Sequence, residues 1–172
     1  MRLLITGGAG YIGSFITKKF STLNNINSIT CVDNLFFKQE FKNKSKKIKN
    51  IVNDVRDKNK MIELYKSHDI IIPLAALVGA PICKKYPKET EEINFKVVDH
   101  MCKNLSASQI VIMPVSNSGY GIGEKDKFCD EKSPLNSGQA DSHIRSVMKN
   151  EFGEPNYLPY LDVRCFLSPQ SG

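Results

Sequence analysis

The feature that most constrains this chain of 172 residues is a cluster of glycines directly after its first apolar run. Arg2–Thr6 is a short run of strand-forming residues, and the sequence from Thr6 to Gly13 reads TGGAGYIG. Apolar residues at helical spacing continue from Tyr11 to Leu23, so the glycines stand at a predicted strand-to-helix junction. Glycines at 7, 10 and 13 permit a tight turn, a close backbone approach by a bound group, and tight packing of helix on strand.

The rest of the chain alternates short apolar runs with helical segments. The predicted strands are Arg2–Thr6, Ser28–Asp33, Lys49–Asn53, Asp69–Pro73 and Gln109–Val115, and the predicted helices are Tyr11–Leu23, one through Met61–Tyr65, and Glu89–Leu105. Nearly continuous apolar strands joined by helices are typical of a parallel sheet covered on both faces. Because crossovers between parallel strands are right-handed, we expect a doubly wound α/β fold of the Rossmann type with five to six strands.

A carboxylate, Asp33, ends the second predicted strand twenty residues beyond Gly13. A carboxylate at this place accepts hydrogen bonds from ribose hydroxyls and repels a 2′-phosphate, so it favours NAD over NADP. The start of the helix would present free N–H groups to the phosphates. The glycines alone could serve a structural turn, but strand, glycines, helix and acid in register favour dinucleotide binding. The predicted contacts are Gly7, Gly10, Tyr11, Ile12, Gly13, Asp33 and Asn34.

On these residues the chain resembles the extended short-chain dehydrogenase/reductase superfamily, specifically its NAD-dependent nucleotide-sugar epimerases and dehydratases, through about residue 136. The resemblance implies that Asp54 and Val55 flank the adenine and that the turn Leu74-Ala75-Ala76 passes under the cofactor. It also implies that Asn94 holds that turn. Alone, Asn94 could be a solvated helix residue and Asp54 a helix cap, but both occur together with the glycine motif.

The resemblance extends to one catalytic residue. Ser116 stands four residues before the pair Tyr120-Gly121, as the catalytic hydroxyl of the family does, which implies a hydrogen bond to a substrate oxygen during hydride transfer. The family's acid/base motif, Tyr-x-x-x-Lys, is not found, because residues 137–151 contain no tyrosine.

Two other pairs have the spacing of the missing motif. Asp141 and Arg145 would take its places if the helix keeps its register, and Tyr160 and Arg164 share its spacing in a run that looks like a strand. We therefore expect residues 1–136 to form an NAD-binding domain and residues 137–172 a divergent tail, with one short helix (Asp141–Phe152) and one short strand (Tyr160–Phe166). The family's substrate domain is expected to be absent or vestigial.

Two functions remain open at this point. One is the NAD-binding domain of a nucleotide-sugar epimerase or dehydratase, acting on UDP- or dTDP-hexoses but without the full catalytic machinery. The other is a non-catalytic NAD-binding module or partner subunit. A nucleotide sugar is the substrate that the resemblance implies, and a homodimer is compatible with it.

Composition excludes several other classes. Six of the lysines that give the net charge of +6 lie in residues 38–49, between two predicted strands, and without interleaved arginines they indicate a solvated loop and no nucleic-acid partner. Five cysteines without a C-x-x-C pair and three histidines without ligand spacing predict no metal site. The longest apolar stretch, Ile70–Pro81, is too short to cross a bilayer and no leader is recognisable, so we expect a cytoplasmic protein with no membrane contact.

Overall fold

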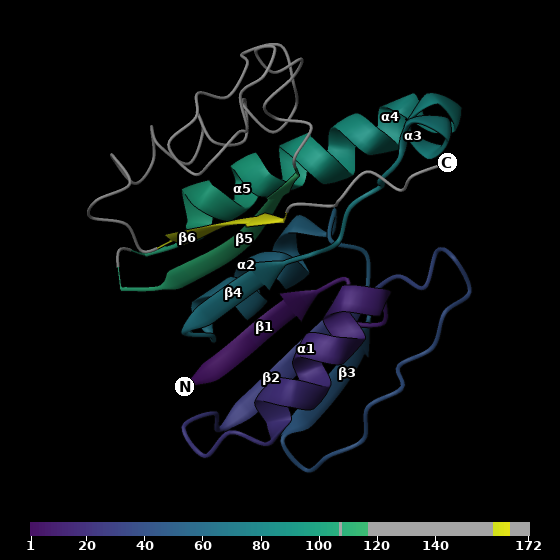
Figure 1. Ribbon diagram of the computed structural model, residues 1–172. Helices are drawn as coiled ribbons and strands as arrows, with labels where there is room; N and C mark the ends of the chain where they lie inside the picture. The colour runs from purple at the N-terminus through teal and green to yellow at the C-terminus, as the bar shows by residue number, and fades with distance from the viewer. Residues whose placement is uncertain (107, 117–159, 166–172) are drawn as a thin grey trace, which may run out of the picture.

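A parallel sheet organises the computed structural model, which describes residues 1–106, 108–116 and 160–165 (Figure 1). Its strands are β1 (Arg2–Thr6), β2 (Ser28–Asp33), β3 (Ile48–Val52), β4 (Ile70–Pro73), β5 (Ile110–Ser116) and β6 (Tyr160–Cys165). Their order is β3-β2-β1-β4-β5-β6, and each neighbouring pair is parallel. The strand order reverses between β1 and β4, which is where doubly wound folds bind their ligands. The predicted Rossmann fold is confirmed.

Helices cover both faces of this sheet (Figure 1). They are α1 (Tyr11–Ser21), α2 (Lys58–Lys66), α3 (Ala80–Lys85), α4 (Pro87–Glu91), the π-helical turn η1 (Glu92–Lys96) and α5 (Val97–Asn104). Successive side chains of a strand point to opposite faces. Leu4 of β1 accordingly packs with residues of α2 and α5, whereas Leu3 and Ile5 pack on the side of α1.

The helix predicted over Glu89–Leu105 is found as the continuous run of α4, η1 and α5, whereas the short helix α3 was not predicted. In α1, the apolar spacing identifies the inward face only in part, since Ile16 and Phe20 pack against the core. Gly13 and Thr17 are the buried residues of α1, while Ile12 and Phe15 are 50% and 70% exposed. The close contact of Gly13 with the preceding turn sets this orientation, because the residue one turn later then also faces the sheet.

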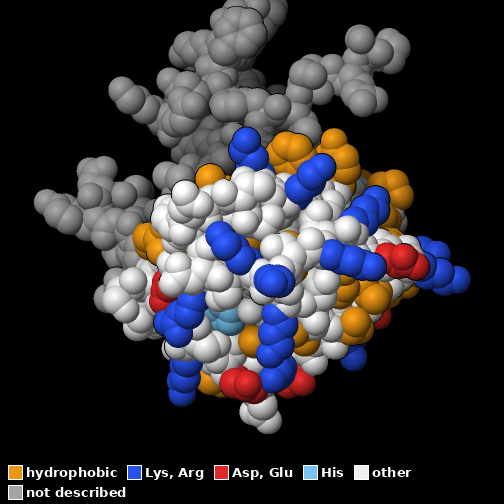
Figure 2. Space-filling view, turned by 90° about the horizontal axis from the view of Figure 1, so that it is seen from below, with side chains coloured by type: hydrophobic (Ala, Val, Ile, Leu, Met, Phe, Trp, Pro, Cys, Tyr) orange, Lys and Arg blue, Asp and Glu red, His pale blue; other side chains and the backbone are white. Residues whose placement is uncertain are grey.

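The segment between β2 and β3 forms no helix or strand, and Lys38, Lys42, Lys44 and Lys46 within it are exposed. The predicted solvated loop is therefore present. Figure 2 shows lysine and arginine side chains spread over one face of the molecule, with uncharged and apolar surface between them. The expectation that no nucleic acid binds there stays a prediction.

Strand β6 extends the sheet beside β5, so the strand predicted at Tyr160–Phe166 is confirmed to within one residue. The predicted helix Asp141–Phe152 lies outside the described residues, and the domain division at residue 136 stays a prediction. Among the described residues, no helix is long and apolar enough to span a membrane. The same part of the chain holds no group of three His, Cys, Asp or Glu side chains suited to a metal ion.

Candidate cofactor-binding site

Two positions of the glycine turn between β1 and α1, Gly7 and Gly13, have no room for a side chain. Gly7 has a φ of +70°, and a Cβ there would lie 2.8 Å from the backbone nitrogen of Ala75. A Cβ on Gly13 would collide with the carbonyl oxygen of Gly7. At Gly10 the nearest atom would be the same oxygen, at 3.2 Å, so the outer side of Gly10 is accessible. Gly7 and Gly13 thus occupy the turn and the packing contact that their spacing predicts, and the approach of a bound group at Gly10 stays a prediction.

The start of α1 is built to face a negative charge. Its N-cap is Gly10, which has no side chain to satisfy the first N–H groups, and the first turn contains no acidic residue. The free N–H groups and the positive end of the helix dipole favour an anion. Tyr11 and Ile12, both predicted contacts, lie at this end and are 93% and 50% exposed. A pyrophosphate matches these donors.

Asp33, at the end of β2, lies beside this turn and is only 6% exposed. Its Oδ2 accepts a hydrogen bond from the backbone N–H of Ala9 at 3.1 Å. Its Oδ1 accepts from the N–H of Leu35 at 2.9 Å and from Nε2 of Gln39 at 3.0 Å. The carboxylate therefore joins the glycine turn to the loop after β2, at the place predicted for the adenosine ribose.

Gln39 was not predicted as a site residue. It follows Asp33 by six residues in a loop whose sequence has no periodicity, so no sequence signal could have placed it on the carboxylate. Among the described residues, its Oε1 is the one buried side-chain nitrogen or oxygen without a hydrogen-bond partner.

Asp54 follows β3 at the same edge of the sheet. Its carboxylate accepts hydrogen bonds from Nε and Nη2 of Arg56 at 2.9 and 2.8 Å, and from Nδ2 of Asn34 at 3.1 Å. The hydrogen bonds from Arg56 lower the pKa of Asp54 to about 2, against the opposing effect of burial. Arg56 also pairs with Glu92 of η1 at 3.0 Å. Asp54 thus links the ends of β2 and β3, while Val55 is 7% exposed and packs in the core.

Hydrogen bonds from two directions, to Thr6 of β1 and to Asn94 of η1, fix the segment that follows β4. Leu74 N–H donates to the carbonyl of Thr6 at 3.1 Å, and Ala75 N–H donates to the Thr6 hydroxyl at 3.3 Å. Asn94 makes two bonds to Leu77: its Oδ1 accepts from the backbone N–H at 2.9 Å, and its Nδ2 donates to the carbonyl at 2.7 Å. Asn94 therefore fixes the segment after Leu74-Ala75-Ala76, as the resemblance implied. It lies in the π-helical turn η1, a feature often found at functional sites.

The predicted catalytic positions are only partly described. Ser116 is the last residue of β5 and pairs in register with Cys165 of β6, so it stands at the carboxyl edge. Tyr160 pairs with Val111, at the opposite end of β5. Val111 and Ser116 are five positions apart along the strand, or about 16 Å. Tyr160 is thus placed at the wrong end of the sheet to assist Ser116, while Tyr120, Asp141 and Arg145 lie outside the described residues.

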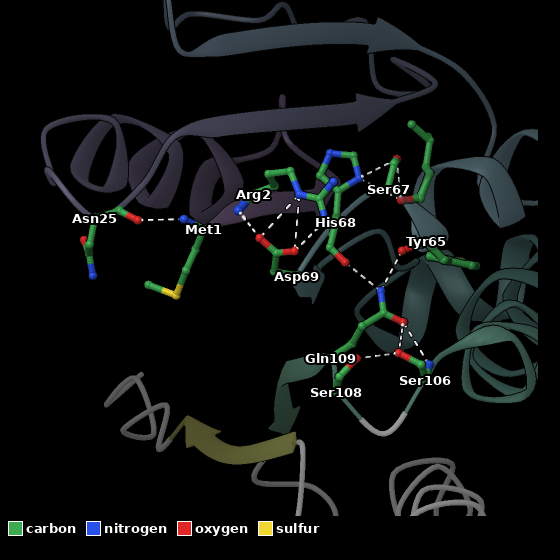
Figure 3. Close-up of polar contacts among 11 residues, drawn as sticks. Met1, Arg2, Asn25, Tyr65, Ser67, His68, Asp69, Ser106, Ser108 and Gln109 are labelled. Carbon is green, nitrogen blue, oxygen red and sulfur yellow. Dashed lines mark hydrogen bonds and ion pairs between the residues drawn. The ribbon is translucent and has the colours of Figure 1, made fainter.

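A second polar cluster occupies the amino edge of the sheet (Figure 3). Arg2 forms an ion pair with Asp69 at 2.7 Å, and Nε2 of Gln109 donates to the carbonyls of Tyr65 and His68, each at 2.6 Å. The two ring nitrogens of His68 lie 2.7 Å from the carbonyl of Leu64 and from the hydroxyl of Thr30.

Burial lowers the pKa of His68. A hollow of about 370 Å³ lies beside these groups. Because the polar side chains of this edge pair with one another and cap the end of α2, the cluster serves the fold.

Comparison with known proteins identifies the family and the fold of the chain. The chain matches the NAD dependent epimerase/dehydratase family over residues 3–142. It is 33% identical over 130 residues to the UDP-N-acetyl-alpha-D-glucosaminuronate decarboxylase of Bacillus cytotoxicus, covering 71% of this chain and 38% of that protein. It is 24% identical over 151 residues to the UDP-glucose 4-epimerase of Rickettsia bellii, covering 78% and 44%. The chain thus spans less than half the length of these two curated relatives.

Among solved structures, the dTDP-glucose 4,6-dehydratase of Streptomyces venezuelae, solved with NAD bound, is similar with a TM-score of 0.77 at 19% identity. The match covers 96% of this chain and 55% of that one, and it shows the shared fold. The family match, which covers most of the chain, confirms the resemblance found in the sequence and NAD as the family's cofactor. The chain belongs to the NAD-dependent epimerase/dehydratase family.

Proposed function

We propose that this chain binds NAD at the carboxyl edge of its sheet, as the cofactor domain of a nucleotide-sugar epimerase or dehydratase. The observation that supports this most strongly is the buried carboxylate of Asp33, bonded to the backbone of the glycine turn at Ala9. One contact thereby couples the predicted ribose position to the predicted pyrophosphate position. The uncapped start of α1 and the accessible side of Gly10 supply the matching anion site.

Different residues at this edge would contact different parts of the cofactor. The N–H groups at the start of α1 would hold the pyrophosphate, and Asp33 with Asn34 would hold the adenosine ribose. Asp54 and Val55 would border the adenine. The turn Leu74–Ala76, held by Asn94 through Leu77, would line the middle of the site.

Catalysis requires more than cofactor binding. When bound, NAD supplies a nicotinamide that takes up and returns a hydride. Ser116 is placed at the carboxyl edge, where its hydroxyl would donate to the oxygen of a nucleotide-sugar substrate. Residues 137–151 contain no tyrosine, and Tyr160 stands at the far end of the sheet. We therefore propose that the chain alone turns over slowly or not at all, since loss of general acid–base help costs about 10²–10⁴ in rate.

These same observations favour the second candidate, a non-catalytic NAD-binding module or partner subunit. Incubation of the chain with NAD and UDP- or dTDP-hexoses, followed by assay of the reduced nicotinamide and of the product sugar, separates the two. Turnover that is lost in Ser116→Ala would support the enzyme, and NAD binding without turnover would support the module.

Titration calorimetry with NAD and NADP tests the cofactor assignment itself. Asp33→Ala should weaken NAD by about 10- to 100-fold, which is about 1–3 kcal/mol, and should weaken NADP less. Glu40→Ala is a matched control, because it removes the same charge from an exposed position in the same loop. Equal affinity for both cofactors, unchanged in Asp33→Ala, would refute the assignment.

A further inference from the structure

Positive charge is concentrated in the first part of the chain. Residues 1–53 contain nine lysines and arginines but only two acidic residues, Asp33 and Glu40. Residues 54–172 contain fifteen basic and sixteen acidic residues, so the excess of positive charge arises entirely before residue 54. Such an asymmetry along a chain indicates an anionic partner.

Two segments of this basic part lie side by side, namely α1 and the loop after β2. Nδ2 of Asn43 donates to the carbonyl of Ser14, near the start of α1, at 2.5 Å. Nζ of Lys47 donates to the carbonyl of Leu23, just beyond the end of α1, at 2.9 Å. The loop therefore runs along the helix in the same direction (Figure 1), and the two segments form one surface.

The exposed side chains of this surface are lysines and aromatic rings. Gly13 and Thr17 are the buried residues of α1, so residues on the opposite side of the helix point to solvent. Phe15, which is 70% exposed, lies on that side, and the loop adds exposed lysines. We call the following residues the lysine–aromatic face: Tyr11, Phe15, Lys18, Lys19, Lys42, Lys44 and Lys46.

The lysines of this face form no ion pair with any residue that the structure describes. The ion pairs between described residues involve basic side chains elsewhere: Arg2, Arg56, Lys60, Lys96 and Lys103. Like charges gathered on one face repel one another, and an anionic partner offsets that repulsion. The charge of the face is thus available to a partner.

The side-chain types of the face favour a membrane surface over a nucleic acid. The chain has no arginine between residues 3 and 55. Arginine binds phosphate groups through paired hydrogen bonds of fixed geometry, whereas lysine is a hydrated point charge. Lysines beside exposed aromatic rings suit a layer of anionic lipid headgroups, which attracts the charges and accepts the rings at its boundary with the acyl chains.

We propose that the lysine–aromatic face binds the surface of a membrane that contains anionic lipids, with the lysines at the headgroups and the ring of Phe15 at the acyl boundary. The contact is peripheral, so it needs no spanning helix. It departs from the expectation of no membrane contact, which rested on the length of an apolar stretch and on a missing leader. Neither feature reports on surface binding. The inference does not depend on NAD binding.

Sedimentation with vesicles tests the lysines. The chain should bind vesicles of equal parts phosphatidylcholine and phosphatidylserine, and not vesicles of phosphatidylcholine alone. Binding should weaken as salt is added, because salt screens the charges. Each lysine near an anionic surface strengthens binding about fivefold, so glutamine at positions 18, 19, 44 and 46 together should weaken it about 100-fold or more.

The matched control removes the same charge from exposed positions of α2, α3 and α4. Glutamine at positions 58, 66, 84 and 88 together should leave vesicle binding within about threefold of the wild type. An equal loss in both fourfold variants would overturn the proposal, because net charge rather than this face would then cause binding.

Phe15→Gln tests the aromatic part of the face. Because the ring is exposed, the unfolding midpoint should stay close to that of the wild type, while vesicle binding should weaken about tenfold. Failure of the folded wild-type chain to bind the anionic vesicles would overturn the proposal. Binding of single-stranded polyuridylate without binding of vesicles would overturn it in favour of a nucleic-acid partner.

Discussion

The two ends of the sheet carry polar side chains of similar kinds and use them differently. At the amino edge, Arg2 pairs with Asp69, and Gln109 joins α2 to β5 through two backbone carbonyls. At the carboxyl edge, the N–H groups that start α1 and the oxygen of Gln39 face no partner among the described residues. The first set of groups stabilises the protein, whereas the N–H groups at the start of α1 are available to an anionic ligand.

The comparison shows that polarity alone does not identify a site. A hollow with arginine, histidine and carboxylate side chains lies at the amino edge, but those groups already bond to each other. Polar groups that the fold leaves without a hydrogen-bond partner indicate a binding site better, because such groups cost stability unless a ligand bonds to them. In parallel sheets, such groups gather at the carboxyl ends of the strands.

The largest effect is expected at Gly13. In Gly13→Ala the new Cβ meets backbone atoms of Gly7 and Gly8, which cannot move aside without opening the turn. We expect a loss of about 3 kcal/mol in the free energy of unfolding, and loss of NAD binding. Gly10→Ala should fold, because its Cβ meets only one atom at 3.2 Å, but should weaken NAD. Urea unfolding and calorimetry separate the two effects, and unaltered NAD binding by Gly10→Ala would contradict the predicted approach at that glycine.

The second-largest effect on stability is expected at the amino edge of the sheet. Gln109→Ala leaves the carbonyls of Tyr65 and His68 without their donor and should lower the free energy of unfolding by about 2 kcal/mol. The affinity for NAD of the folded fraction should stay the same, because Gln109 lies at the far end of the strands. A change in NAD affinity larger than about twofold would contradict the claim that the amino edge takes no part in NAD binding.

His68 makes the amino edge sensitive to mild acid. Burial lowers its pKa below the usual 6.5, so the unfolded chain binds the proton more readily than the folded one. Stability should be complete above pH 6.5 and fall below it as pH drops toward the folded pKa, by at most about 1.4 kcal/mol per pH unit. Thermal unfolding between pH 7.5 and about 5 measures this. His68→Gln should flatten that dependence, whereas His100→Gln, at a half-buried site, should keep most of it.

The smallest effect is expected at the ion pairs of Arg56. The pKa of Asp54 falls from 3.8 to about 2, so its contribution is present above pH 4 and is lost as pH falls toward 2. Because Arg56 and Asp54 are 38% and 31% exposed, Arg56→Gln should cost about 0.5–1 kcal/mol at pH 7. The variant should differ less from the wild type near pH 2. An equal difference at both pH values, by thermal unfolding, would show that charge does not contribute.

Much of the fold follows from the sequence because apolar strands alternate with helices. β1 and β2 have the predicted bounds, β4 begins one residue later than predicted, and β3 and β5 are each shifted by one residue at both ends. The short helix α3 was missed, since six residues that include Pro81 show no helical period. The apolar spacing of α1 does not show that Phe15 faces outward, because the close packing of Gly13 also orients the helix.

The residues of the site also fall into those that the sequence predicts and those that it does not. The glycines, Asp33 and Asn94 are local motifs, and the structure brings them to one edge of the sheet. Gln39 depends on positive φ angles at Leu35 and Lys38, which their residue types do not predict. The contact of Gln109 with Tyr65 joins residues 44 positions apart, without any pattern in between.

Hydrogen–deuterium exchange with and without saturating NAD tests most directly whether the carboxyl edge is the ligand-binding end. The account predicts slower exchange on binding in the glycine turn (residues 7–13), the loop after β2 (34–39) and the turn after β4 (74–78). Exchange at the amino edge, in residues 66–69 and 104–106, should not change. Protection at the amino edge without protection of the glycine turn would contradict the account.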